Sequence, residues 1–207
     1  MSAIQRRMGV EGAKNRDLLV EAAAQLLVNE GYAAITARRV AEQAGFKVQL
    51  VYYYFQSMDE LIQAVVRRNA AKRLDQLDEA MASENPLRAL WRLNGDPVAA
   101  ITASELLALA NHRESIRNEI LTAARQFRTF QIEMIKRQME DRNIDQTRYS
   151  PGAIVTIVAT LARAMAQDHS LGLSEGYDEA LEAIEQGMRL FDKPAPGGAT
   201  APRPKSG

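Results

Sequence analysis

Apolar residues recur at intervals of three and four positions along most of the chain, which is the spacing of amphipathic α-helices. The first stripe predicts a helix over about residues 15–30, and its members are Leu18, Leu19, Ala22, Ala23, Leu26 and Leu27. Gly31 follows this stripe, where a left-handed cap is expected. No segment keeps the two-residue alternation of a half-buried strand, so the pattern predicts an all-α fold.

Proline pairs mark the helix starts in the remainder of the chain. Asn85-Pro86, Asp96-Pro97 and Ser150-Pro151 each place a side-chain acceptor before a proline, so each acceptor is expected to cap a helix. The helices expected after the N-terminal third cover residues 58–81, 86–94, 97–111, 113–142, 151–169 and 176–192. Residues 193–207 are rich in Pro, Gly and Ala and are expected to be disordered.

The N-terminal third has the pattern of two short helices joined by a tight turn. Thr36 caps the first of them, Gly45 makes the turn, and the second begins at Lys47. Ser57 and Glu60 then have the spacing of a capping box, which starts the next helix. A helix-turn-helix of this kind leaves its second helix free to enter a DNA groove, so DNA binding is the leading hypothesis.

Composition and charge are compatible with this hypothesis. The net charge is zero, but residues 1–73 carry 11 Lys and Arg against 7 Asp and Glu, whereas the remainder carries 15 against 19. A basic N-terminal part on an acidic body fits phosphate contact at one end. The chain has no Cys, which excludes disulfides and thiolate metal sites. No apolar run is long enough to span a bilayer and the N-terminus lacks a signal-peptide core, so we expect a cytoplasmic protein that does not contact a membrane.

The helix-turn-helix region resembles the TetR (tetracycline-repressor) family of bacterial transcription regulators. The resemblance covers residues 15–68 and is carried by Ala22–Leu26, Gly31-Tyr32, Thr36, Val40-Ala41, Ala44-Gly45, Tyr52-Tyr53-Tyr54-Phe55, Ser57 and Glu60-Leu61. It implies a flexible arm over residues 1–14 and a three-helix DNA-binding domain over 15–57. Residues 58–192 would then form a helical bundle for ligand binding and dimerisation.

What the resemblance implies for function is a homodimer that binds a near-palindromic, double-stranded operator and is released by a small-molecule inducer, so that it acts as a repressor. The DNA-contacting positions implied are Thr36, Arg38, Arg39, Lys47, Val48, Gln49, Tyr52, Tyr53 and Tyr54. Gln49 can pair with adenine, Val48 can touch a thymine methyl, and Arg38 can read guanine. For Arg39 the alternatives of a phosphate contact and a solvated helix face stay open. Of the three tyrosines, two are expected to touch DNA.

Four positions depart from the family pattern. Met58 stands where a lysine is usual, and Leu50 replaces a common Ser or Thr. Lys47 replaces a common polar N-cap, and Tyr54 stands where histidine is frequent but still offers a hydroxyl. Met58 loses a phosphate contact, and together these changes indicate either a weaker affinity for the DNA backbone or an unusual operator. The alternative hypothesis is therefore a helical dimer that keeps the fold for protein–protein contact without sequence-specific DNA binding.

The C-terminal part offers a candidate ligand pocket and a candidate dimer interface. The pocket residues expected between helices are Trp91, Leu106, Leu109, Phe127, Phe130 and Met134, although each of them fits simple core packing as well. The expected dimer residues are Ile154, Val158, Leu161, Met165, Leu181, Ile184 and Met188. The two histidines, His112 and His169, form no metal-binding pattern, and no catalytic constellation is visible. We therefore expect no metal, no cofactor and no enzymatic activity.

Overall fold

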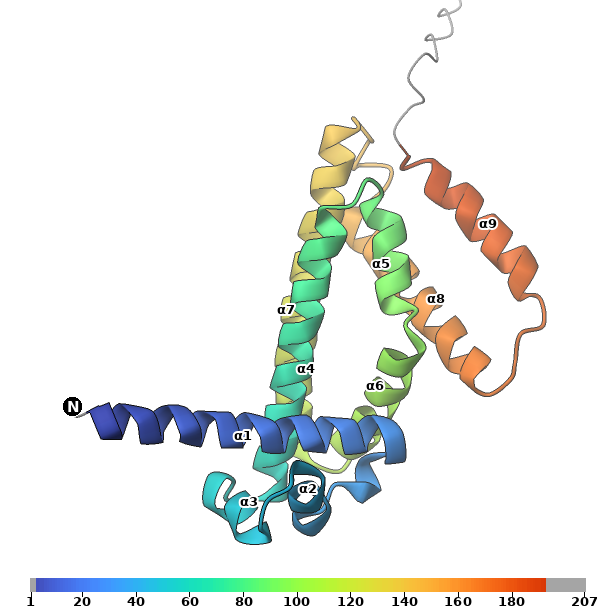
Figure 1. Ribbon diagram of the computed structural model, residues 1–207. Helices are drawn as coiled ribbons and strands as arrows, with labels where there is room; N and C mark the ends of the chain where they lie inside the picture. Colours follow the sequence, from blue (N-terminus) through green and yellow to red (C-terminus); the bar gives the residue numbers. More distant parts are fainter. Residues whose placement is uncertain (1–2, 193–207) are drawn as a thin grey trace, which may run out of the picture.

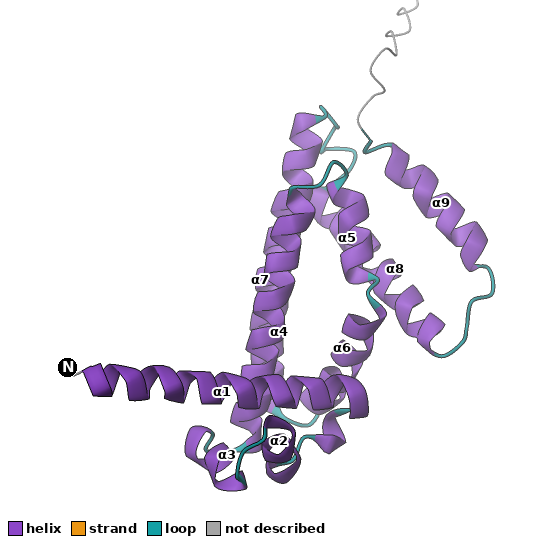
Figure 2. Cartoon of the chain, in the orientation of Figure 1, coloured by secondary structure: helices purple, strands orange, loops and turns teal. Residues whose placement is uncertain are grey.

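A computed structural model of the protein describes residues 3–192, with side chains described from residue 12 onward. Within this range the structure has nine α-helices, one 3₁₀ turn and no strand, which confirms the predicted all-α class (Figures 1 and 2). The elements are α1 (Ala3–Glu30), η1 (Tyr32–Ala34), α2 (Ala37–Ala44), α3 (Val48–Tyr54), α4 (Met58–Met81), α5 (Pro86–Asn94), α6 (Pro97–Ala110), α7 (Glu114–Asp141), α8 (Pro151–Ser170) and α9 (Tyr177–Arg189).

The helices form a small unit at one end of a longer bundle. α4 and α7 run side by side as the long axis of the molecule, and α1 crosses their lower end, with α2 and α3 beneath it (Figure 1). α5, α6 and α8 pack along the bundle, and α9 turns back beyond α8 (Figure 1). In the described part of the chain, no helix is long and apolar enough to cross a membrane.

Two hydrophobic cores correspond to these two parts. The first contains apolar residues of α1 to α4, among them Leu19, Val40, Val51 and Phe55, which are each at most 1% exposed. The second lies among α4, α5, α7, α8 and α9 and includes Leu77, Leu90, Ile135, Met139 and Val155. Leu106 and Leu109 of α6 and Ile116 of α7 belong to the first core, so the bundle packs directly on the N-terminal unit.

The start of the first helix differs from the prediction. α1 begins at Ala3 rather than near Asn15, and residues 3–14, expected to form an arm, are its first turns. These residues carry no proline and no strong stop signal, and most of them favour helices, so a search for an apolar stripe misses them. The expected disordered tail, residues 193–207, lies outside the described residues.

Only some of the predicted N-cap side chains form the expected hydrogen bond. Asp96 accepts the backbone N–H of Ala99 at 3.0 Å, and Ser57 accepts that of Glu60 at 3.2 Å. Asn85 and Ser150 make no side-chain cap bond, although the proline that follows each of them does open its helix. At these two helix starts the proline, with its fixed φ, is at the predicted first helical position, but the predicted side-chain cap does not form.

Candidate nucleic-acid interface

Backbone bonds at the turn hold α2 and α3 in a fixed relation. The Thr36 hydroxyl oxygen accepts the N–H of Arg39 at 3.3 Å, which caps α2. Gly45 ends α2 in the left-handed region, with φ 73° and ψ 27°, and the Phe46 N–H donates to the Ala41 oxygen at 2.8 Å. Because residues with a Cβ rarely adopt this conformation, the glycine fixes the sharp entry to α3. Val51, 1% exposed, anchors α3 on the first core.

The outer face of α3 presents polar and aromatic side chains to solvent. Gln49, Tyr52 and Tyr53 lie three and four residues apart, so they share one face of the helix. Tyr52 is 65% exposed and Tyr53 is 78% exposed, and Gln49 is exposed as well. Lys47, at the start of the helix, is also exposed. This face can enter a groove without any rearrangement of the core.

The other residues of α3 pack partly against the first core. Tyr54 is half-buried against the first core and lies edge-on to Tyr53, with ring centres 4.9 Å apart. Val48 and Leu50 are also half-buried against that core. The structure therefore exposes two of the three tyrosines, and contact of any of these residues with DNA stays a prediction.

The two arginines of α2 differ in their partners. Both are exposed, but the Arg39 guanidinium forms an ion pair with Glu30 at 2.7 Å. Arg38 makes no ion pair within residues 12–192. Arg38 is thus available to a base or phosphate, whereas Arg39 is held against the end of α1.

Sequence reasoning missed the contacts that join the N-terminal unit to the bundle. The Tyr32 N–H donates to a carboxylate oxygen of Glu105 at 2.9 Å. The Arg113 guanidinium pairs with Asp59, and Arg67 pairs with Glu119 at 2.7 Å. Because these partners are more than 50 residues apart in the chain, no local pattern could have found them.

Gly31 lies at the first of these contacts and has two reasons to be glycine. Its φ of 78° and ψ of 175° belong to a region that is essentially restricted to glycine. A Cβ there would also lie 3.1 Å from the Glu105 carboxylate. The sequence predicted Gly31 as a helix cap. The structure shows in addition that the lack of a side chain at Gly31 leaves room for the Glu105 carboxylate of α6.

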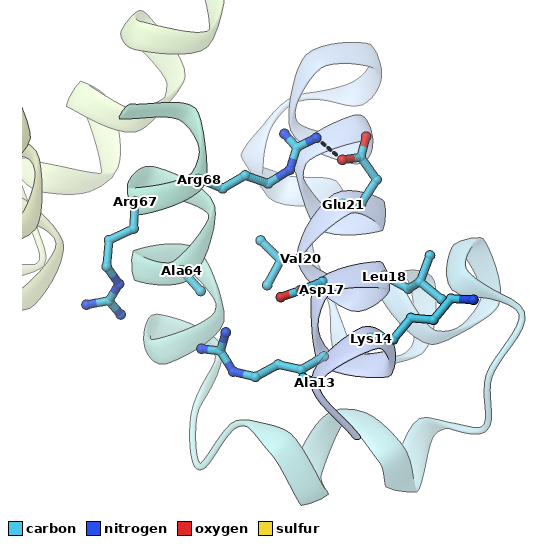
Figure 3. A pocket seen from close by; sticks show the side chains of 10 residues that line it. Ala13, Lys14, Asp17, Leu18, Val20, Glu21, Ala64, Arg67 and Arg68 are labelled. Atoms are coloured by element: carbon cyan, nitrogen blue, oxygen red, sulfur yellow. Dashed lines mark ion pairs between the residues drawn. The ribbon is translucent and has the colours of Figure 1, made fainter. Parts of the chain in front are cut away.

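A cavity of about 900 Å³ opens between α1 and α4 (Figure 3). Arg68 of α4 reaches across it to pair with Glu21 of α1, and Arg67 points away from α1 (Figure 3). Leu18, expected on the buried face of the first helix, lines this cavity and is 42% exposed. A second cavity, of about 240 Å³, lies between α4 and α7. Neither is lined by a residue of the predicted pocket.

The structure does not bring the six predicted pocket residues together. Leu106 and Leu109 are buried in the first core, whereas Met134 is buried in the second, with Trp91 and Phe127 packed against it. Phe130 is 44% exposed, because it lies at the outer edge of the apolar stripe of α7. Leu106, Leu109 and Met134 are therefore core residues of the described structure.

The predicted dimer stripe combines residues that are buried in the single chain with residues that are exposed. Val158 and Met188 are buried in the second core, and Ile154 and Ile184 pack against it. Leu161 and Leu181 are each 42% exposed, Met165 is half-buried, and Ile157, which the stripe omitted, is 58% exposed. On α8 the predicted residues lie four and three positions apart, along the boundary between the face that packs on the core and the face that is exposed. The predicted set therefore contains residues from both faces.

Comparisons with known proteins agree with this geometry. Residues 19–65, which contain all of α2 and α3, match the family described as bacterial regulatory proteins, tetR family. The HTH-type transcriptional regulator BetI of Rhizobium meliloti (strain 1021) is 30% identical over 132 residues. The helix-turn-helix region of the chain is that of the TetR family. The match spans 59% of this chain and 64% of the length of BetI.

Solved structures show the TetR-family fold over most of the chain. A TetR transcription regulator from Haloarcula marismortui has a TM-score of 0.66 at 18% identity, covering 86% of this chain and 96% of that one. A protein from Saccharomonospora viridis in complex with choline has a TM-score of 0.67 at 16% identity, covering 86% and 95%. The fatty acid degradation regulator FadR from Bacillus halodurans has a TM-score of 0.65 at 15% identity, covering 90% and 97%. At these identities the likeness concerns the fold alone.

Proposed function

We propose that this chain is a homodimeric transcriptional repressor of the TetR family that binds a near-palindromic operator and is released by a small molecule. The observation that carries the proposal is the exposed face of α3 formed by Gln49, Tyr52 and Tyr53, together with the exposed Arg38 of α2, within a matched helix-turn-helix. An amide and a guanidinium can read adenine and guanine in the major groove, and tyrosine hydroxyls can bond to phosphates. The domains proposed are residues 15–57 for DNA binding and 58–192 for regulation and dimerisation.

Exposed apolar side chains on the last helices support the homodimer. Ile157 and Leu161 lie four residues apart on the outer face of α8, and Leu181 of α9 is exposed as well. A second copy can cover these residues about a two-fold axis with the same surface. The two α3 helices would then contact half-sites about 34–36 Å apart, one turn of DNA.

The contacts between the N-terminal unit and the bundle support control by a ligand. Glu105 of α6 bonds to the backbone of Tyr32, and Arg113, before α7, pairs with Asp59 at the start of α4. A ligand that favours another position of α6 or α7 would move α2 and α3 through these contacts. It can weaken DNA binding only by its difference in affinity for the two conformations. Choline in the S. viridis structure supports a small-molecule site in this fold.

The proposal is tested by selecting genomic DNA fragments with the purified chain at about 150 mM salt, where nonspecific phosphate binding is weakened. We expect an enriched near-palindrome that Gln49→Ala no longer recovers. Gln56→Ala is the matched control, because Gln56 is also an exposed glutamine but lies after α3. Recovery of no common sequence by the parent chain would reject operator binding and favour a helical dimer that contacts other proteins.

A further inference from the structure

The C-terminal end of α3 lies against α1. The guanidinium of Arg16 in α1 is 4.9 Å from the centre of the Phe55 ring, and Phe55 is the residue that ends α3. One turn earlier in α1, the backbone of Gly12 faces the Tyr54 hydroxyl, because a Cβ at Gly12 would lie 3.5 Å from that oxygen. Two residues of α1, one turn apart, therefore lie against the two consecutive residues at which α3 ends.

α3 is too short to be stable without support from other elements. It has 7 residues, Val48–Tyr54, whereas an isolated helix of fewer than about 12–15 residues is at best marginally stable in water. Its last turn is closed by the Phe55 N–H, which donates to the Val51 oxygen at 2.9 Å. The exposed Tyr52 and Tyr53 lie within this turn. If the turn opens, the backbone that carries these two tyrosines moves with it.

Arg16 supplies support of this kind. Phe55 is 1% exposed and Arg16 is half-buried, so the guanidinium is held over the ring instead of extending freely into solvent. An aromatic face attracts a guanidinium, and a cation near the C-terminal end of a helix also gains from the helix dipole. Within residues 12–192, Arg16 forms no ion pair with an Asp or Glu, so no carboxylate draws it away from the ring.

The alternative role for Arg16 is a direct contact with a DNA phosphate, as for any cation of a DNA-binding unit. Two observations oppose this role. The guanidinium already lies over the Phe55 ring. Arg16 also lines the cavity between α1 and α4, together with Ala64 and Arg68 of α4, whereas the polar outer face belongs to α3. Both observations favour a role of Arg16 in holding the helices of the DNA-binding unit together.

We propose that Arg16 is a positioning residue for operator binding, which covers Phe55 and so holds the last turn of α3, with Tyr52 and Tyr53, in place for the DNA groove. This inference rests on the proposed function and adds to it a residue that does not itself touch DNA. Side chains that are already in place lose less freedom on binding, so the support raises the affinity for the operator. The salt dependence of binding reports the cations that meet phosphates, so it should not change when Arg16 is replaced.

The first test is the affinity of the full-length chain for a selected operator, measured by fluorescence anisotropy at several salt concentrations. Arg16→Ala should weaken binding about three- to tenfold without a change in the salt slope. Arg16→Met should restore most of this loss, because a thioether side chain can cover the ring without a charge. Lys14→Ala is the matched control, since it removes the same charge from an exposed side chain two residues away. It should change the affinity by less than about twofold.

Two outcomes of this test would overturn the proposal. If Arg16→Ala lowers the salt slope by about one and Arg16→Met does not restore binding, Arg16 contacts a phosphate directly. If Arg16→Ala weakens binding no more than Lys14→Ala does, covering the Phe55 ring contributes nothing to operator binding.

The second test needs no operator, because hydrogen exchange of the Phe55 amide in the free chain reports the opening of the last turn of α3. Arg16→Ala should speed this exchange about three- to tenfold, whereas Lys14→Ala should not. The amide of Met139, in the second core, should keep its rate in both variants. Unchanged exchange at Phe55, or an equal increase at Met139, would reject local support of α3 by Arg16. A chain that selects no operator but shows the local change would refute the proposed repressor and leave this support standing.

Discussion

Arg38 and Arg39 are neighbours on α2, yet their side chains have different freedom. The Arg39 guanidinium is bonded to Glu30 at 2.7 Å, so a contact with DNA would first have to break that ion pair. The Arg38 side chain is exposed and forms no ion pair in the described part of the chain. An exposed pair such as Arg39–Glu30 contributes at most about 1 kcal/mol to stability, so its loss should not unfold the protein.

Arg38→Ala is therefore expected to lower operator affinity by about 1–3 kcal/mol and to relax the preference at one base pair. Arg39→Ala should change the affinity by less than about 1 kcal/mol. The measurement is fluorescence anisotropy with a selected operator and with single-base variants of it. Equal losses in the two variants would mean that the Arg39–Glu30 pair opens on DNA and that both arginines contact it.

At the scale of single helices, the turn between α8 and α9 is held by one strong side-chain bond. The Tyr177 hydroxyl donates to an Asp168 carboxylate oxygen at 2.6 Å. This bond raises the pKa of Tyr177 to about 12, with burial and the Asp168 charge adding to the effect. Only the protonated phenol can donate, so the bond supports the start of α9 while Tyr177 remains neutral.

The stabilisation from this bond should depend on pH in a defined direction. The folded pKa lies above the unfolded value of about 10, so the contribution is complete below pH 10 and is lost as the pH rises through about 12. The measurement is the difference in melting temperature between the parent and Tyr177→Phe from pH 8 upward. This difference should shrink above pH 10. A difference that is constant with pH would mean that the hydrogen bond contributes no stability.

The sequence predicted the helices far better than it predicted their outer faces. Proline at Pro86, Pro97 and Pro151 and the glycine at Gly45 act through local backbone geometry, so the residues themselves mark these boundaries. Which side of α8 is buried depends on residues far along the chain, so the stripe chosen from the sequence combined Val158, which is buried in the second core, with the exposed Leu161. The same holds for the outer face of α3. The motif predicted where this helix lies in the sequence, but it could not predict that Tyr52 and Tyr53 are exposed while Tyr54 packs on the first core, because that depends on how α3 sits against the other helices.

At the scale of the whole molecule, the outer faces of α8 and α9 carry apolar surface without a cover in the single chain. Ile157 is 58% exposed, and Leu161 and Leu181 are each 42% exposed. Isolated exposed leucines are ordinary, but neighbours on one helix face mark a contact surface. The proposed two-fold dimer would bury these residues and bring two copies of α3 to one side.

Leu161→Glu should then shift the chain toward monomers, because it places a charge in the centre of the dimer contact. We expect the dimer dissociation constant to rise at least about 30-fold, corresponding to about 2 kcal/mol or more. Leu171→Glu is the matched control, since Leu171 is 85% exposed in the turn after α8 and lies outside the proposed contact. Sedimentation over a range of concentrations measures both. Identical behaviour of the two variants would assign the dimer to another surface.

The first hydrophobic core has a consequence for building hybrid regulators. Leu106, Leu109 and Ile116 come from α6 and α7, yet they pack among the residues of α1 to α4. A DNA-reading segment cut after Tyr54 and fused to a foreign sensor would lose these side chains and expose the apolar surface that they cover. A DNA-binding segment that is to be fused to another regulatory domain must therefore retain α6 and the first turns of α7. Otherwise the new regulatory domain must supply apolar residues of matching shape.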